Sequence, residues 1–196
     1  MNPKISLFTA CLLLGALLQA NAPLQAQDPY VCDPGDCPGG VWEPTTGFLS
    51  HSSSFNGCDY EVLYRVREGL CNGNPRFDIQ IVTVILDNSA ACQAVDIPAI
   101  LEFAVRDLLV QNPMGWTIPP PPACLVGVRA YMSGCWRRID NPPTFPADAI
   151  LSPCYESTCC RFIYRLCGPG TTPILEGAVG GECPPSQPPD CVSICL

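Results

Sequence analysis

The sequence has little positive charge, and little charge of either sign. Of its 196 residues, 10 are Lys or Arg and 18 are Asp or Glu, which gives a net charge of −8. Nucleic acids and anionic membrane surfaces bind basic faces, so this balance argues against both as partners. With only 14% charged and 8% aromatic residues, the composition also excludes a coiled coil, an acidic disordered tail and a collagen-like rod.

Residue types that carry catalysis and cofactor binding are scarce as well. His51 is the only histidine, it lies in a serine-rich run over residues 50–54, and no G-x-S-x-G motif occurs. The only lysine is Lys4, so the rest of the chain cannot form a lysine-containing phosphate-binding loop. We therefore predict no catalytic residues, no catalytic triad and no cofactor.

The patterns of common metal sites are incomplete. The cysteines never show the C-x₂-C spacing of structural zinc sites, and the single histidine cannot supply a second ligand pair. The EF-hand pattern is absent, although Asp33 and Asp36 flank a tight turn and Asp87 follows a predicted strand. We predict no metal site, and a calcium ion near these aspartates is the alternative.

Only one long apolar run is present, over residues 5–18, and Lys4 precedes it. Small residues follow as far as Ala26, which is the order of a secretory signal peptide. The run is shorter than the roughly 20 residues that cross a membrane. We predict a signal peptide over residues 1–26, cut after Ala26 with Ala20 as the alternative. The protein is then secreted or at the cell surface, without a membrane span (periplasmic or extracellular if bacterial).

Cysteine is abundant, with 15 residues in the chain. Cys11 would leave with the signal peptide, and the remaining fourteen are an even number, as a disulfide framework requires. Such a framework is typical of oxidising compartments. We predict up to seven disulfides. The candidate cysteines are Cys32, Cys37, Cys58, Cys71, Cys92, Cys124, Cys135, Cys154, Cys159, Cys160, Cys167, Cys183, Cys191 and Cys195.

Local spacing predicts two features of this framework. A Pro-Gly turn lies between Cys32 and Cys37 and brings them close together, so we predict a local bridge between them. Cys159 and Cys160 are neighbours, and neighbouring side chains of a strand point to opposite faces. We therefore predict that these two cysteines bond to separate partners, one on each side of a sheet.

Regular structure is predicted over a core domain of residues 58–167. Apolar residues recur at helical spacing over residues 96–112, with Asp96 as the N-cap. Strands precede and follow this helix, and a loop of about eight residues joins the first two. We predict an α+β fold in which a small antiparallel sheet, in β-β-α-β-β order, packs against one amphipathic helix. The strands are predicted at residues 59–67, 76–86, 125–139 and 160–167. The third is either one strand broken at residues 133–134 or two short strands, over residues 125–132 and 136–139.

Arms rich in proline and glycine flank this core. We predict an irregular N-terminal arm over residues 27–57, in which residues 50–54 form a flexible loop, and an irregular C-terminal tail over residues 168–196. The tail holds three cysteines, so at least one must bond outside the tail if every thiol is paired. We therefore predict that the tail is stapled to the core.

These patterns together favour a secreted, disulfide-rich, non-catalytic binding or structural module. Its partner would be a protein, either a second copy or another chain, because a surface with few charges loses little solvation on association. One alternative is a small secreted hydrolase that uses carboxylates or a metal ion. Another is an inhibitor or toxin-like effector that presents the rigid proline-rich segment over residues 119–124.

Overall fold

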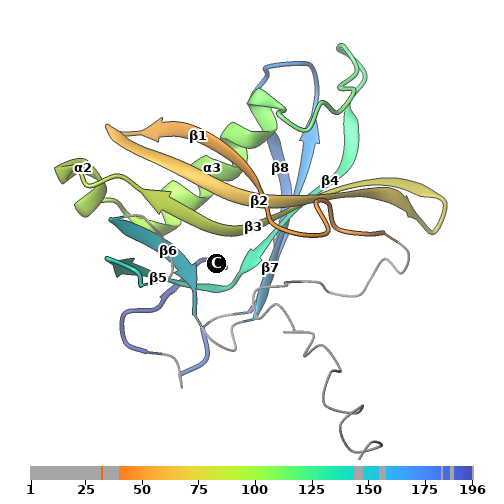
Figure 1. The fold of residues 1–196 in the computed structure, drawn as a ribbon. Coiled ribbons are helices and arrows are strands. Elements are labelled where there is room, and N and C mark those ends of the chain that lie inside the picture. The colour runs from red at the N-terminus through yellow and green to blue at the C-terminus, as the bar shows by residue number, and fades with distance from the viewer. Residues whose placement is uncertain are drawn as a thin grey trace, which may run out of the picture.

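The computed structural model describes residues 32, 40–143, 148–154, 158–181, 183–185 and 188–195. The predicted signal peptide lies outside these residues. Within them the chain forms nine strands and two helices (Figure 1). None of the described helices is long and apolar enough to span a membrane. The elements are β1 (Leu49–Phe55), β2 (Cys58–Cys71), β3 (Asn74–Leu86), α2 (Ala90–Gln93), α3 (Ile97–Gln111), β4 (Leu125–Ser133), β5 (Cys135–Asp140), β6 (Ala149–Pro153), β7 (Cys159–Leu166), β8 (Ile174–Val179) and β9 (Val192–Ser193).

All nine strands belong to one large mixed sheet. The strand order is β8-β7-β4-β3-β6-β5-β9, and β2 and then β1 continue from the other side of β3. β3 and β4 run parallel and are connected through α3, whereas the other pairs are antiparallel. The predicted α+β fold, with a small antiparallel sheet in β-β-α-β-β order and one helix, is therefore wrong, because the described chain is mostly strand and forms one large mixed sheet beside two helices. β1, β8 and β9 lie in the predicted irregular arms, where exposed side chains and short length hide the apolar alternation of a strand.

The hairpin of β2 and β3 is tighter than predicted. Its strands extend until Cys71 pairs with Asn74, so only Asn72 and Gly73 form the turn. Both turn residues have positive φ, 52° and 80°, as in the type I′ turn, whose twist matches that of the flanking strands. The predicted eight-residue loop is wrong, because Asn-Gly is itself the turn and the residues around it continue the two strands.

Helix α3 forms where the apolar spacing predicts it. The Asp96 carboxylate accepts a hydrogen bond from the Ala99 amide at 3.1 Å, and Asn112 ends the helix in the left-handed conformation. Glu102 and Arg106, four residues apart on the exposed side of the helix, form an ion pair at 2.8 Å. The apolar stripe packs on the inner face of the sheet. Its buried members are Ile100, Leu101, Ala104, Val105, Leu108 and Leu109.

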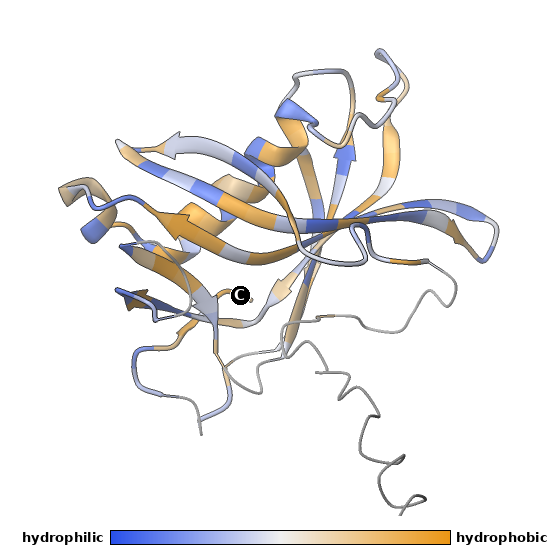
Figure 2. Cartoon of the chain, in the orientation of Figure 1, coloured by the Kyte–Doolittle hydropathy of each residue, from blue (hydrophilic) through white to orange (hydrophobic). Residues whose placement is uncertain are grey.

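The C-terminal half of β3 is covered on both faces, as its continuous apolar run predicts. Ile81, Val82 and Leu86 are all buried, although side chains of neighbouring residues point to opposite sides. Figure 2 shows this part of β3 as a hydrophobic, orange segment at the centre of the molecule. The sheet therefore has a second covered face opposite α3.

That outer face holds a buried charge cluster that the sequence analysis did not predict. Asp78 is 0% exposed and accepts hydrogen bonds from Arg67 Nε at 2.9 Å and from Arg76 Nε at 2.9 Å. Arg76 also donates to the Tyr131 hydroxyl. Trp42 covers the cluster, with the Arg67 guanidinium 4.3 Å from its ring centroid. Trp42 is thus fixed to the sheet by the contact of its ring with the Arg67 guanidinium.

Six disulfides hold the described residues together. Cys32 bonds to Cys159, so the predicted bridge from Cys32 to Cys37 is wrong; Cys37 itself lies outside the described residues. The Pro-Gly pattern is a local signal and carries no information about Cys159, which lies 127 residues further along the chain. Cys160 bonds to Cys195, so the two neighbouring cysteines have separate partners. The other bridges are Cys58–Cys92, Cys124–Cys167, Cys135–Cys183 and Cys154–Cys191, and Cys71 is also disulfide-bonded.

These bridges give the C-terminal tail its place in the fold. Cys183, Cys191 and Cys195 each bond to a cysteine that precedes the tail. β8 and β9 also add the tail to the sheet through β7 and β5. The tail is therefore part of the folded unit in the described residues, and its disulfides fit a protein of extracellular type.

Candidate functional site

The path of paired strands ends at β8, where one strand edge is exposed. β8 pairs with β7, and no described strand pairs with its other side. Its side chains are unusually apolar for such a position: Ile174, Leu175 and Val179 are 47%, 42% and 56% exposed. An edge of this kind presents free backbone hydrogen-bonding groups beside apolar side chains, which favours pairing with another strand.

A bulge determines which side chains of β8 face which way. Leu175 lies opposite Tyr164 and Ala178 lies opposite Phe162, so both point to the inner face on which α3 packs. The register shifts between these pairs, and Glu176 is the additional residue. The remaining side chains point to the outer face. Ile174 lies opposite Arg165 and Val179 opposite Arg161, and the Glu176 carboxylate pairs with Arg165 Nε at 2.9 Å.

On the inner face, β8 forms one wall of a groove beside α3. The groove has a volume of about 200 Å³, and the side chains of both elements line it. Burial raises the pKa of the Tyr164 phenol in its lining to about 12, so this phenol stays neutral at physiological pH. The lining residues are Pro98, Glu102, Val105, Met132, Phe162, Tyr164, Leu175, Ala178 and Ile194.

Disulfides on both sides of β8 hold this edge in place. Cys167, before the strand, bonds to Cys124 at the start of β4, and Cys183, after the strand, bonds to Cys135 of β5. The strand itself contributes little buried surface, since five of its six residues are exposed. The bridges therefore provide order that burial alone would not give.

His51 lies in β1 and not in the flexible loop predicted over residues 50–54. Alternate residues of β1 face α3, and the His51 Nε2 atom lies 2.7 Å from Asp107 Oδ2. The two side chains are 18% and 12% exposed. Among the described residues, no hydroxyl or thiol group forms a hydrogen bond to His51. The pair joins the first strand to the helix, and sequence spacing could not have indicated Asp107 as the partner.

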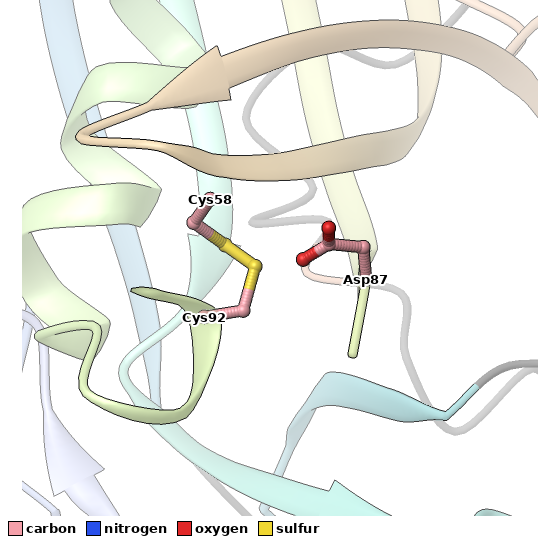
Figure 3. Close-up of side chains that lie close together, drawn as sticks. All are labelled: Cys58, Asp87 and Cys92. Atoms are coloured by element: carbon pink, nitrogen blue, oxygen red, sulfur yellow. A yellow bond between two sulfur atoms is a disulfide. The ribbon is translucent and has the colours of Figure 1, made fainter. Parts of the chain in front are cut away.

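Asp87, Cys58 and Cys92 form a cluster whose residue types are those of a metal site. Figure 3 shows the Asp87 carboxylate facing Cys58 and Cys92, and the ligand atoms of all three residues lie within 4.8 Å of one another. The two cysteines are joined in a disulfide, however, and metal ions are bound by free thiolates. The arrangement leaves only one ionisable ligand. Asp33 and Asp36, the other aspartates of the calcium alternative, lie outside the described residues.

Acidic side chains do gather at the opposite end of the sheet from β8. Asp59, Glu61, Asp87 and Asp148 line one open hollow of about 570 Å³ together with Ser52, Ser53 and Tyr60. These carboxylates are candidates for the hydrolase alternative.

The proline-rich segment is exposed and clamped at its base. Ile118 is buried before it and Cys124 is bonded to Cys167 after it, whereas residues 120–123 are exposed. A backbone hydrogen bond from the Ala123 amide to the Pro120 carbonyl, 3.1 Å long, turns the segment back on itself. It is therefore a short exposed loop that is clamped at its base.

Comparisons with known protein families, with curated proteins and with solved structures gave no match. A function must therefore be inferred from the residues of this chain. The exposed apolar edge of β8 was missed at the sequence level because the strand lies between Pro173 and Gly180 in a segment rich in turn-forming residues. Its only signal was the apolar pair Ile174 and Leu175 followed by Val179.

Proposed function

We propose that this chain is a secreted, non-catalytic binding module that accepts a polypeptide strand at the edge of β8. The observation that carries the proposal is the conjunction of an unpaired strand edge, exposed apolar side chains and an adjoining groove in the described residues. In strand addition, backbone hydrogen bonds supply affinity and pockets for alternate side chains supply selectivity.

The rigidity of the edge supports this function. Binding is weakened when flexible segments have to be ordered, and a strand held before association avoids much of that loss. The Cys124–Cys167 and Cys135–Cys183 bridges hold the connections on either side of β8. The site is thus prepared for a partner even though the strand has little core contact of its own.

A crosslinking experiment in the native medium tests the proposal with two matched variants. Leu175→Lys places a charge at the inner side of the β8 edge, whereas Leu70→Lys makes the same change at a 70% exposed leucine near the β2–β3 turn. We expect Leu175→Lys to lose at least about tenfold in crosslinked partner, because a lysine ammonium resists burial beside an apolar strand. Leu70→Lys should capture as much as the wild type. Equal capture by both variants would contradict the proposal.

The inhibitor function is a second candidate, and the clamped loop over residues 120–123 favours it. Rigid exposed loops bind in the clefts of other proteins with little loss of conformational entropy. The same crosslinking experiment separates the two functions, because it maps the attached residues. Crosslinks confined to residues 120–123 and insensitive to Leu175→Lys would favour the loop as the binding site.

A further inference from the structure

We infer that the strand which β8 accepts is β8 of a second copy, paired antiparallel about a two-fold axis between Glu176 and Gly177. This inference rests on the proposed function of the same edge and names its partner. A two-fold interface requires a surface that complements itself. β8 meets this requirement in one register.

In that register, apolar residues lie opposite apolar residues. Ile174 lies opposite Val179 of the partner subunit, and Leu175 lies opposite Ala178 of the partner subunit. Ile174 and Val179 both point to the outer face, whereas Leu175 and Ala178 both point to the inner face. Side chains directly opposite in an antiparallel pair must share a face. The bulge at Glu176 is what makes this possible, because without the additional residue Leu175 and Ala178 would face opposite sides.

Neighbouring registers fail this requirement. A shift by one residue in one direction places Glu176 opposite Glu176 of the partner subunit, so that two like charges meet directly. It also places Ile174, on the outer face, opposite the partner's Ala178, on the inner face. A shift by one residue in the other direction places the inner Leu175 opposite the outer Val179 of the partner subunit. Of these three registers, which pair most of the strand, the one centred between Glu176 and Gly177 satisfies faces and charge together.

The charges on the strand fit this register as well. Glu176 is the only charged residue of β8, and Arg165 of the same chain neutralises it. Gly177, with no side chain, would lie opposite the partner's Glu176 and would leave that ion pair undisturbed. A strand from an unrelated protein would have to meet the same pattern of faces by chance, whereas a second copy meets it by symmetry.

The size of the interface indicates a weak dimer. β8 has six residues, so the pairing of two such strands falls below the roughly 1,200 Å² that stable interfaces bury. We expect a dissociation constant in the micromolar range, which corresponds to about −8 kcal/mol or weaker. A dimer of this strength forms where the protein is concentrated, and dissociates on dilution.

Gly177 offers a test that is specific to the register. A side chain added at Gly177 meets no atom within 4 Å, and the backbone there does not require glycine. In the dimer, Gly177→Glu would place two like-charged pairs across the axis with the partner's Glu176, whereas Gly177→Lys would place two opposite-charged pairs. Gly69, in the exposed part of β2, is equally open and supplies the controls Gly69→Glu and Gly69→Lys.

Sedimentation equilibrium from about 1 μM to about 1 mM, a range that spans weak dimers, measures the outcome for all five proteins. We expect the wild type to dimerise and Gly177→Glu to raise the dissociation constant about tenfold. Gly177→Lys should dimerise at least as well as the wild type, and the gap between the two variants should shrink at high salt. Both Gly69 variants should match the wild type. Equal effects of Gly177→Glu and Gly177→Lys would overturn the register.

Sedimentation of these five proteins, read together with the crosslinking of Leu175→Lys, distinguishes failure of this inference from failure of the proposed function. A wild type that stays monomeric at every concentration overturns self-pairing. If Leu175→Lys nevertheless loses its crosslinked partner, β8 is a binding edge for a different chain. If the wild type is monomeric and Leu175→Lys keeps its partner, both proposals fail.

Discussion

β1 and β8 are both edge strands of one sheet, yet they present opposite surfaces. β1 exposes serines, and its inward residues are fixed to α3 through the His51–Asp107 contact of 2.7 Å and the stacking of Phe55 on Phe103, with ring centroids 4.9 Å apart. β8 exposes Ile174 and Val179 and has no comparable anchor. An edge that is polar and tied to a helix has little to gain from another strand, whereas an apolar edge does.

The two edges also differ in what holds them in the sheet. β1 is held by side-chain contacts with α3 in addition to the Cys58–Cys92 bridge that follows it, whereas β8 is held chiefly by disulfides in the segments that precede and follow it. Covalent bridges can order a strand without burying it. The difference indicates how a chain can keep an apolar edge both ordered and accessible.

The largest effect on the free energy of unfolding is expected from the buried charge cluster around Asp78, at the centre of the sheet and between its two edges. Asp78→Asn removes the charge that compensates Arg67 and Arg76, so two guanidinium groups remain buried with weaker acceptors. Breaking a buried pair of this kind costs about 3–5 kcal/mol. Denaturant unfolding should show this loss with both edges unfolding together. Asp140→Asn, at an exposed pair with Arg138, is the control and should cost less than about 1 kcal/mol.

A smaller and local effect is expected when one edge loses its bridge. Replacing Cys124 and Cys167 together by serine should cost about 2–4 kcal/mol and speed amide exchange in β8 more than in β1. The matched variant replaces Cys58 and Cys92, which lie next to the β1–β2 turn and enclose a loop of similar length. It should speed exchange in β1 more than in β8. Exchange that rises equally in both strands for either variant would contradict separate support of the two edges.

The sequence indicated elements whose own residues carry the signal. Asp96 and Asn112 bounded α3 correctly because capping is a local interaction, and Cys159 and Cys160 were correctly assigned separate partners because strand alternation is local too. The turn at Asn72 and Gly73 was also encoded locally, but the strands around it were predicted too short. These features need no knowledge of the rest of the fold.

Other features depend on residues that are distant in the sequence. The pairing of Asp78 with Arg67, the contact of His51 with Asp107, and the parallel pairing of β3 with β4 all require the tertiary structure. β1 and β8 lacked apolar alternation for opposite reasons. One strand is polar on its exposed side, and the other is apolar on both sides and contains a bulge. The candidate site was therefore hidden, because an exposed edge strand has no buried face to give it a pattern.

The last prediction concerns the dependence of folding stability on pH, which involves one buried tyrosine near each edge. Burial raises the pKa of Tyr60, opposite Ser53 of β1, and of Tyr164, in the β8 groove, to about 12. Tyrosines of the unfolded chain titrate near pH 10, so the folded state disfavours their ionisation. The free energy of unfolding should keep its full value below about pH 10 and should fall as the pH rises toward 12. Tyr60→Phe and Tyr164→Phe should each reduce this loss in denaturant unfolding. Absorbance titration of the folded protein that shows both phenols ionising near pH 10 would contradict the prediction.

Amide hydrogen exchange measured at increasing protein concentration tests the role of β8 most directly. If two copies pair through this edge, protection of the β8 amides rises with concentration while that of the β1 amides stays constant, and Gly177→Glu moves the rise to about tenfold higher concentration. Protection of the β8 amides that does not change from the lowest to the highest concentration would contradict self-pairing. A rise confined to the β1 amides would also contradict it, because the interface would then be at β1.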